Sequence, residues 1–203
     1  MAKLYFRYGA MNSGKTTALM QVAYNYKERG MRVLILKPAV DTKGQDCIVS
    51  RLGISCKVDV LVTPEMDVVE LVRAEAAEHG APACILCDES QFFTPEQAEQ
   101  LFRVTVDLSI PVICYGLRAD FMMRGFPGST RLLELAHTIE ELKTICACGR
   151  KAICNGRKVN GEFVFEGAQV AIDTVDDVQY QSLCPQCWYR EYRAFLARHP
   201  KAE

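Results

Sequence analysis

Gly9-Ala-Met-Asn-Ser-Gly-Lys-Thr16 is the strongest indication of the fold class, because it meets the pattern G-x-x-x-x-G-K-[S/T] at every fixed position. An apolar run at residues 3–8 precedes it and predicts a strand. Residues 16–29 predict a helix that ends at Gly30. A strand, a glycine-rich turn and a helix in this order form the P-loop, which binds the phosphates of nucleotides. The stretch therefore predicts an α/β core with a phosphate site.

The residue types of this stretch suit an anion. Glycine lets the backbone fold tightly so that its N–H groups face the phosphates, and the helix N-terminus adds partial positive charge. Lys15 is predicted to hold the β- and γ-phosphates of ATP, and the Thr16 hydroxyl to bind Mg²⁺. The predicted ATP-binding residues are Gly9, Ala10, Met11, Asn12, Ser13, Gly14, Lys15 and Thr16.

A second apolar strand, expected at residues 83–87, ends in two carboxylates, Asp88 and Glu89. Ligands of open α/β sheets bind at the carboxyl ends of the strands. An acid in this position of P-loop enzymes helps to hold Mg²⁺, which is the role predicted for Asp88. Glu89 has three open interpretations: activation of water in an ATPase, general base toward a substrate hydroxyl, or a solvated surface acid.

The rest of the first 140 residues alternates between strand and helix patterns. Further strands are expected at residues 32–37, 58–62 and 111–115. Helices are expected from Thr63-Pro64-Glu65 to about His79, and after a capping box that joins Thr94 to Gln97. Residues 39–56 are expected to form a long loop. Apolar strands alternating with helices predict a parallel sheet covered on both faces.

The character of the chain changes near residue 140. Cysteine pairs appear, Asn160-Gly161 predicts a hairpin turn, and a terminal helix is expected from Pro185 to about Arg198. We therefore predict two domains. Residues 1–140 form a P-loop, RecA-like α/β core that binds ATP, and residues 141–203 form a small cysteine-bearing subdomain with a C-terminal helix.

Two cysteine pairs flank this hairpin and predict a structural zinc site, because four closely spaced thiolates form a tetrahedral site for Zn²⁺. The predicted ligands are Cys146, Cys148, Cys184 and Cys187, with Cys154 as a competing candidate. Cys84 and Cys87 also have C-x-x-C spacing. Positions i and i+3 of a strand point to opposite faces, so these two are expected to be buried without a metal.

Composition excludes several classes of protein. The 203 residues carry a net charge of −1, which gives no indication of a nucleic-acid or membrane-surface partner. No apolar run is long enough to cross a membrane, and we expect no secretory signal, because the first residues lack a basic stretch followed by a long apolar one. Ten cysteines in such a chain indicate free thiols or metal ligands, so we expect a cytoplasmic location.

Taken together, these motifs resemble the type II thymidine kinase family, and its bacterial members most closely. The resemblance rests on the P-loop with Met11, on residues 88–93, on residues 115–121 and on the cysteine pairs, and it covers residues 2 to about 192. It implies a zinc-ribbon subdomain that carries a lasso-like loop. It also implies transfer of the γ-phosphate of ATP to the 5′-hydroxyl of thymidine, with Mg²⁺, in nucleotide salvage, by a homotetramer.

The resemblance also assigns residues. It implies that Glu89 is the catalytic base, that Arg51 lies in the phosphate region and that Gln91 belongs to the nucleotide site. It supports the four zinc ligands, since bacterial members can have the spacing of Cys146 and Cys148. The residues that it places around the thymidine are Met11, Phe92, Leu117, Phe121, Phe126, Val170, Ile172 and Tyr180.

The lasso, residues 166–182, departs from the family pattern. Relatives usually have Ile-Gly-Gly where this chain continues from Ile172 through a longer segment without glycine to Tyr180. One alternative is therefore a related deoxynucleoside kinase with altered base choice. Another is a P-loop ATPase whose zinc ribbon binds nucleic acid through Arg150, Lys151, Arg157 and Lys158, although these residues are expected to solvate the hairpin.

Overall fold

The computed structural model describes residues 1–41, 46–50, 53–169 and 177–199, which form two compact units. The first unit comprises Met1–Tyr8, Gly14–Leu117 and Phe126–Glu141. The second comprises Gly9–Ser13, Arg118–Gly125 and Leu142–Glu203. The chain therefore crosses between the units five times, and two short segments from its first 125 residues belong with its C-terminal part.

A six-stranded sheet with the order β5-β2-β6-β7-β1-β8 forms the centre of the first unit, and all of its described pairings are parallel. The predicted parallel sheet is thus confirmed. β2, β6 and β7 are buried along their whole length, as their apolar sequences require. The strands are β1 (Leu4–Tyr8), β2 (Val33–Pro38), β5 (Val60–Val62), β6 (Cys84–Cys87), β7 (Val112–Gly116) and β8 (Thr138–Glu141).

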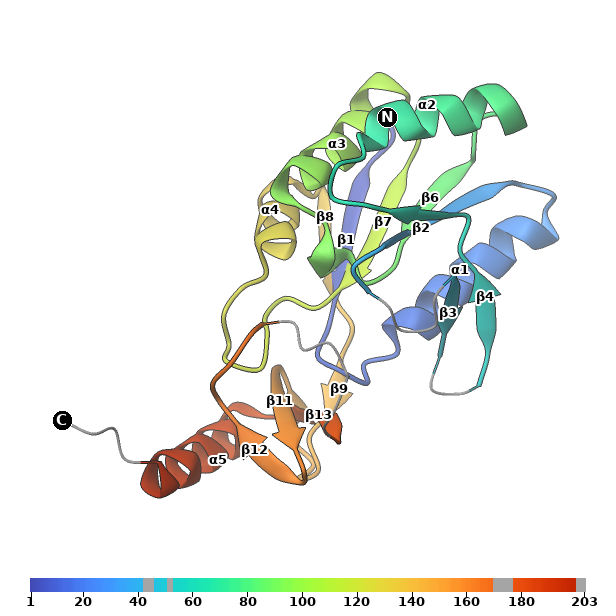
Figure 1. Cartoon of the computed structure of the whole chain (residues 1–203). Helices are drawn as coiled ribbons and strands as arrows, with labels where there is room; N and C mark the ends of the chain where they lie inside the picture. Colours follow the sequence, from blue (N-terminus) through green and yellow to red (C-terminus); the bar gives the residue numbers. More distant parts are fainter. Residues whose placement is uncertain (42–45, 51–52, 170–176, 200–203) are drawn as a thin grey trace. The chain divides into compact units, whose positions relative to one another are not determined.

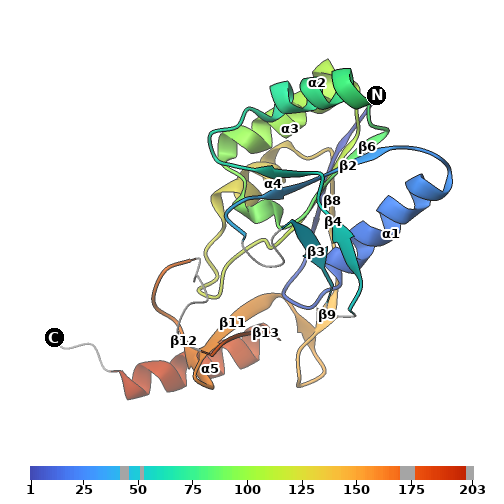
Figure 2. The ribbon, with the colours of Figure 1, turned by 45° about the vertical axis from the view of Figure 1, so that its right-hand side comes forward.

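Helices cover both faces of this sheet, with α1 on one face and α2, α3 and α4 on the other (Figure 1), and the turned view in Figure 2 agrees. Cys87 packs in the core beneath α2, α3 and α4, whereas Cys84 lies beside Tyr26 of α1. The two cysteines therefore face opposite ways, as predicted. The helices are α1 (Lys15–Glu28), α2 (Val68–His79), α3 (Pro95–Asp107) and α4 (Pro127–Leu135), with a short 3-10 helix, η1 (Ser90–Phe92).

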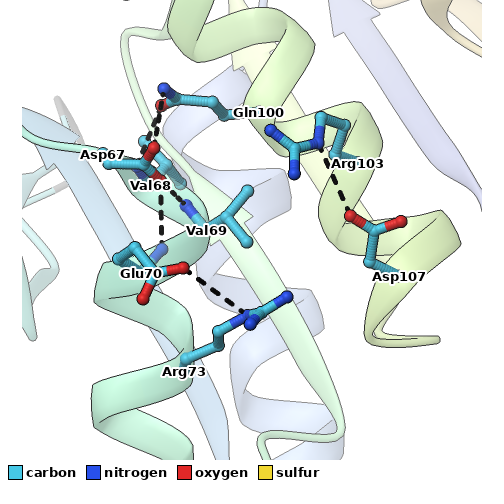
Figure 3. A network of polar contacts seen from close by, with 8 residues as sticks. All are labelled: Asp67, Val68, Val69, Glu70, Arg73, Gln100, Arg103 and Asp107. Carbon is cyan, nitrogen blue, oxygen red and sulfur yellow. Dashed lines mark hydrogen bonds and ion pairs between the residues drawn. The ribbon is translucent and has the colours of Figure 1, made fainter.

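The start of α2 was predicted wrongly, because the helix begins at Val68 rather than near Thr63. Asp67 is its cap and accepts hydrogen bonds from the N–H groups of Val69 and Glu70 at 2.8 and 3.0 Å. Gln100 of α3 accepts the N–H of Val68 at 2.9 Å, which satisfies a further donor of the helix start (Figure 3). The sequence around Val68 gives no indication of this partner in α3, so the start of α2 could not be predicted from it.

The start of α3 is as predicted. The Thr94 hydroxyl accepts from the N–H of Gln97 at 3.1 Å, and the Gln97 side chain accepts from the N–H of Thr94 at 3.2 Å. Both partners of this capping box lie within one turn, so the sequence alone is sufficient to find it.

Residues 39–56 contain a hairpin where a long loop was predicted. β3 (Cys47–Val49) pairs antiparallel with β4 (Ser55–Lys57). Gly53 occupies the turn with φ of 80°, and Ile48 is 2% exposed. With one buried residue in β3 and none in β4, the alternation is too weak to detect in a polar segment.

An antiparallel sheet with the order β12-β11-β13 forms the second unit, together with a short pair, β9 with β10, and one helix. The Asn160-Gly161 turn joins β11 to β12 as predicted, and both residues have positive φ. Trp188 and Phe165 pack edge to face in the core beside the helix. The elements are β9 (Thr144–Ile145), β10 (Lys151–Ala152), β11 (Cys154–Val159), β12 (Glu162–Val164), β13 (Val178–Leu183) and α5 (Pro185–Arg198).

Candidate active site

The phosphate loop requires its glycines for two different reasons. Gly14 has φ of 78°, in the left-handed region, directly before the first residue of α1. A Cβ on Gly9 would lie 2.3 Å from the Ser13 hydroxyl oxygen and 2.5 Å from the carbonyl oxygen of Leu142, so a side chain there would clash. The loop therefore has the tight backbone that the motif predicts.

Lys15 and Asp88 lie at the ends of two elements of the first unit. Lys15 begins α1 and is 8% exposed, and Asp88 follows β6 and is 4% exposed. The pKa of Asp88 is raised to about 7, first because burial disfavours the carboxylate and second because Glu89 adds a like charge. The nearby Lys15 ammonium lowers the pKa of Asp88, but by less. A bound cation would favour the ionised carboxylate, so the donor chemistry fits Mg²⁺.

Glu89 is held in an uncommon conformation. Its φ of 43° and ψ of 41° are left-handed, which is unusual for a residue other than glycine. The Gln91 side-chain amide donates to a Glu89 carboxylate oxygen at 2.7 Å, and its own carbonyl oxygen accepts from the N–H of Leu117 at 3.0 Å. Gln91 is 2% exposed, so its side chain is a fixed link from the end of β7 to Glu89. The sequence singled out Gln91 but not this link.

Close packing keeps the ends of β6 and β7 together. A Cβ on Gly116 would lie 2.6 Å from the Ser90 hydroxyl oxygen and 2.9 Å from the Gln91 carbonyl oxygen. Next to it, the carbonyl oxygen of Leu117 accepts from the Ser129 hydroxyl at 2.5 Å. Leu117 itself is 8% exposed. Any residue larger than glycine at position 116 would therefore displace the side chain that orients Glu89.

The predicted thymidine-contacting residues fall in both units. In the first, the Phe92 and Phe126 rings meet edge to face with centroids 5.7 Å apart; Phe126 is 4% exposed and Phe92 is half-buried. In the second, Phe121 is 1% exposed, while Met11 and Tyr180 are half-buried.

Asn155 of β11 is a residue that the sequence analysis missed. Its side-chain carbonyl oxygen accepts from the N–H of Met11 in the phosphate loop at 2.8 Å. Its amide donates to the carbonyl oxygen of Ala119 at 2.8 Å, and Asn155 is 4% exposed. It therefore joins two segments of the second unit that lie 144 and 36 residues away along the chain. No local pattern signals such a contact.

The expected solvation of Arg157 was wrong. Its side chain is 6% exposed, and its guanidinium carbon lies 3.8 Å from the centroid of the Phe121 ring. Of the proposed basic cluster, Arg150 and Lys151 are exposed, and the Lys158 ammonium lies 4.7 Å from the Phe163 ring centroid. Arg157 reaches inward because the Phe121 ring and backbone carbonyl groups bind it there.

The four predicted zinc ligands, Cys146, Cys148, Cys184 and Cys187, lie together, with all four sulfur atoms within 4.8 Å of one another. The sulfur atoms of Cys148 and Cys184 are 3.5 Å apart. Tetrahedral zinc bound by thiolates at about 2.3 Å requires separations of this size. Cys154 is not in the cluster and contacts the Met123 sulfur at 3.6 Å instead. The donor set and its size fit Zn²⁺.

Three of the predicted site residues, Arg51, Val170 and Ile172, lie outside the described residues.

The sequence model of the thymidine kinase family matches residues 2–188. The chain belongs to the thymidine kinase family. A thymidine kinase of Ruegeria pomeroyi is 46% identical over 93% of this chain and 94% of its own length. One of Chromobacterium violaceum is 45% identical over 94% of this chain and 100% of its own length. One of Legionella pneumophila (strain Paris) is 49% identical over 85% of this chain and 83% of its own length.

Membership of this family agrees with the fold, because the match includes both the phosphate loop and the cysteine cluster. It makes the chain a phosphotransferase. None of the described helices is long and apolar enough to cross a membrane.

Proposed function

We propose that this chain is a thymidine kinase that transfers the γ-phosphoryl group of ATP to the 5′-hydroxyl of thymidine, giving dTMP. One observation carries the proposal. In a chain that matches the thymidine kinase family over residues 2–188, the Glu89 carboxylate follows β6 directly after the buried Asp88 and is oriented by Gln91. An oriented carboxylate beside a phosphate site is what transfer to a hydroxyl needs.

The nucleotide would bind along the phosphate loop, residues 9–16. Lys15 would hold its β- and γ-phosphates, and Thr16 and Asp88 would hold Mg²⁺. When bound, Mg²⁺ neutralises charge on the phosphates. Arg51 would steady charge that develops during transfer, and Gln91 would keep the nucleotide end of the site in place.

Glu89 would accept the proton of the 5′-hydroxyl as that oxygen attacks the γ-phosphorus of ATP, the bond from this phosphorus to the bridging oxygen breaks, and ADP leaves. Its strained backbone and its hydrogen bond to Gln91 restrict the directions in which the carboxylate can point. Correct orientation of a catalytic group removes part of the entropic barrier to reaction. This orientation favours the role of a base for Glu89 over that of a solvated surface acid.

Thymidine contacts are proposed by resemblance. In the first unit they are Phe92, Leu117 and Phe126. In the second they are Met11, Phe121 and Tyr180, together with the lasso, whose proposed contacts Val170 and Ile172 lie outside the described residues. Backbone groups of such a loop can recognise thymine, because the base offers one N–H between two carbonyl groups.

Zn²⁺ on Cys146, Cys148, Cys184 and Cys187 would be structural, since all four ligands are protein thiolates. Residues 1–140 would act as the ATP-binding core and residues 141–203 as the zinc-binding lasso subdomain. A cytoplasmic homotetramer is the expected working form.

The experiment is a product assay with ATP, Mg²⁺ and a panel of deoxynucleosides, followed by separation of the monophosphates. We expect dTMP as the main product. A different preferred base would support altered selectivity, for which the glycine-poor segment after Ile172 is a reason. ATP turnover that needs DNA or RNA rather than a nucleoside would contradict the proposal and favour a nucleic-acid-binding ATPase.

A further inference from the structure

Arg157 makes two hydrogen bonds to the backbone at the start of the lasso. Its Nη1 donates to the carbonyl oxygen of Ala168 at 2.8 Å, and its Nη2 donates to that of Glu166 at 2.7 Å. The residue between these two carbonyl groups is Gly167, with φ of 107°. A Cβ there would lie 2.7 Å from Nη2, so the guanidinium lies against this backbone only because residue 167 is glycine.

The same guanidinium lies over the ring of Phe121. Its carbon is 3.8 Å from the ring centroid, a close cation–π distance. The backbone of Phe121 is held as well, because its carbonyl oxygen accepts from the Trp188 indole N–H at 2.9 Å. Arg157 thus contacts both the start of the lasso and the segment 118–125.

Two further contacts reinforce this arrangement. The Gln169 amide donates to one Asp120 carboxylate oxygen at 3.1 Å, while the other oxygen accepts from the N–H groups of Met122 and Arg124, both at 2.8 Å. On β13, Tyr180 lies directly opposite Arg157. Opposed residues of an antiparallel pair project from the same face of the sheet, so Tyr180 and Arg157 share a face.

Stability does not explain why a cation occupies this position. Nε of Arg157 is buried without a hydrogen-bond partner, and no ion pair among the described residues includes Arg157. A buried charge without a carboxylate carries a desolvation penalty, and apolar side chains of similar volume often replace such charges without loss of stability. What the guanidinium adds is a rigid planar fork that holds two carbonyl groups at once.

We propose that Arg157 is a positioning residue for nucleoside binding. It fixes the Glu166 and Ala168 carbonyl groups against Phe121, on the sheet face that also carries Tyr180. The inference rests on the proposed function, since Phe121, Tyr180 and the lasso are the proposed thymidine contacts of this unit. A loop that recognises a base through its backbone is sensitive to the position of its first residues.

Two substitutions test this role, Arg157→Lys and Arg157→Met. Lysine keeps the charge but loses the fork, and methionine keeps most of the volume without charge. Lys158→Met is the matched control, because it removes a cation over an aromatic ring from the next residue of the same strand, on the opposite face. Zinc content and thermal midpoint are measured for each variant.

Steady-state kinetics and amide exchange of the ligand-free protein give the readouts. Both variants are expected to raise the KM for thymidine roughly 10-fold, as loss of charged hydrogen bonds implies, with the KM for ATP within about twofold of wild type. Amides of residues 166–169 should exchange faster. A thymidine KM within about twofold of wild type in both variants, or an equal rise for ATP, overturns the proposal.

Gln169→Ala supplies a second test if the Arg157 variants lose zinc. It removes the bonds to Asp120 and to the carbonyl oxygen of Gly125 without touching Arg157, and should change the thymidine KM in the same direction by a smaller factor. An unchanged value would then overturn the proposal. Failure of the proposed function is a separate result. A wild-type chain that phosphorylates no thymidine overturns that function, while amide exchange at residues 166–169 still tests whether Arg157 holds them.

Discussion

The two units are stabilised by different means. The first has an extended core of 18 buried residues, mostly aliphatic, between a parallel sheet and three helices. The second has a smaller core of nine buried residues, three of which are ligands of the thiolate cluster and three aromatic. Small units with little aliphatic burial commonly need a metal or disulfides. The comparison predicts that the first unit folds by apolar burial, and that the second also needs the metal ion that its cysteine cluster could hold.

Metal removal should have the largest effect and should affect only the second unit, because structural zinc sites contribute of order 10 kcal/mol to folding. We expect Cys184→Ser, or a strong chelator, to unfold the second unit while the far-ultraviolet signal of α1 to α4 largely remains. Trp188, the single tryptophan of the chain, is 4% exposed in the second unit, so its fluorescence reports on that unit alone. Its emission should shift to longer wavelength.

Cys47→Ser with Cys56→Ser is the control, since both cysteines lie in the hairpin of the first unit. This double variant should keep one zinc per chain and the native emission. Native emission from a metal-free chain would contradict the zinc dependence of the second unit.

A change confined to the first unit should affect chemistry rather than folding. In Glu89→Gln the shape of the side chain and its contact with Gln91 are kept, but the proton acceptor is lost. We expect kcat to fall roughly 10²-fold or more, with ATP affinity and zinc content unchanged. Glu96→Gln, at an exposed position in the first turn of α3, should keep normal turnover. Turnover near wild type in Glu89→Gln would exclude Glu89 as the base.

The link through Gln91 predicts a smaller effect. Gln91→Ala frees the Glu89 carboxylate from its 2.7 Å hydrogen bond, and we expect kcat to fall about 10-fold because orientation is lost. Gln100→Ala removes another glutamine that bridges two elements of the same unit, through Val68 and Asp67. It should reduce stability by a similar amount without changing kcat. An equal loss of kcat in the two variants would assign Gln91 a structural role only.

The smallest predicted effect is the pH dependence of stability that Asp88 causes. Its folded pKa of about 7 lies above the value of an unfolded chain, so the folded state binds the proton more tightly. The contribution of Asp88 to stability is therefore greatest below about pH 4, the pKa of an unfolded Asp, and is lost as pH rises to about 7, including about 1 kcal/mol between pH 6 and pH 8. Urea unfolding without nucleotide or metal should show this loss in wild type and not in Asp88→Asn. Parallel losses in both proteins would assign the dependence to other groups.

The sequence was most informative where both partners of an interaction lie close along the chain. The Thr94 capping box, the Asn160-Gly161 turn and the helix that starts at Pro185 are local, and all three were predicted. The parallel sheet followed from apolar strands, because burial on both faces leaves a continuous pattern. The zinc ligands followed from spacing and were found together.

Errors and omissions concern partners that are distant in sequence. The start of α2 depends on Gln100, which lies 32 residues from Val68. Asn155 holds Met11 across 144 residues, and Arg157 is drawn inward by Phe121 and the carbonyl groups of Glu166 and Ala168. Composition and periodicity describe each strand alone and contain no information about such pairs. Such distant pairs become apparent only in the folded structure.

The hydrogen bond from the N–H of Met11 to Asn155 has a consequence for the order of folding. The phosphate loop is synthesised well before Asn155, yet residues 9–13 belong to the same unit as Asn155, and the last helix of that unit ends at Arg198. Contacts between distant residues form late, because the intervening chain must be ordered first. A nascent chain therefore contains the complete phosphate-loop motif, residues 9–16, before Asn155 is available to accept the N–H of Met11. We expect the phosphate loop to reach its final geometry only after Asn155 and the rest of this unit have been synthesised.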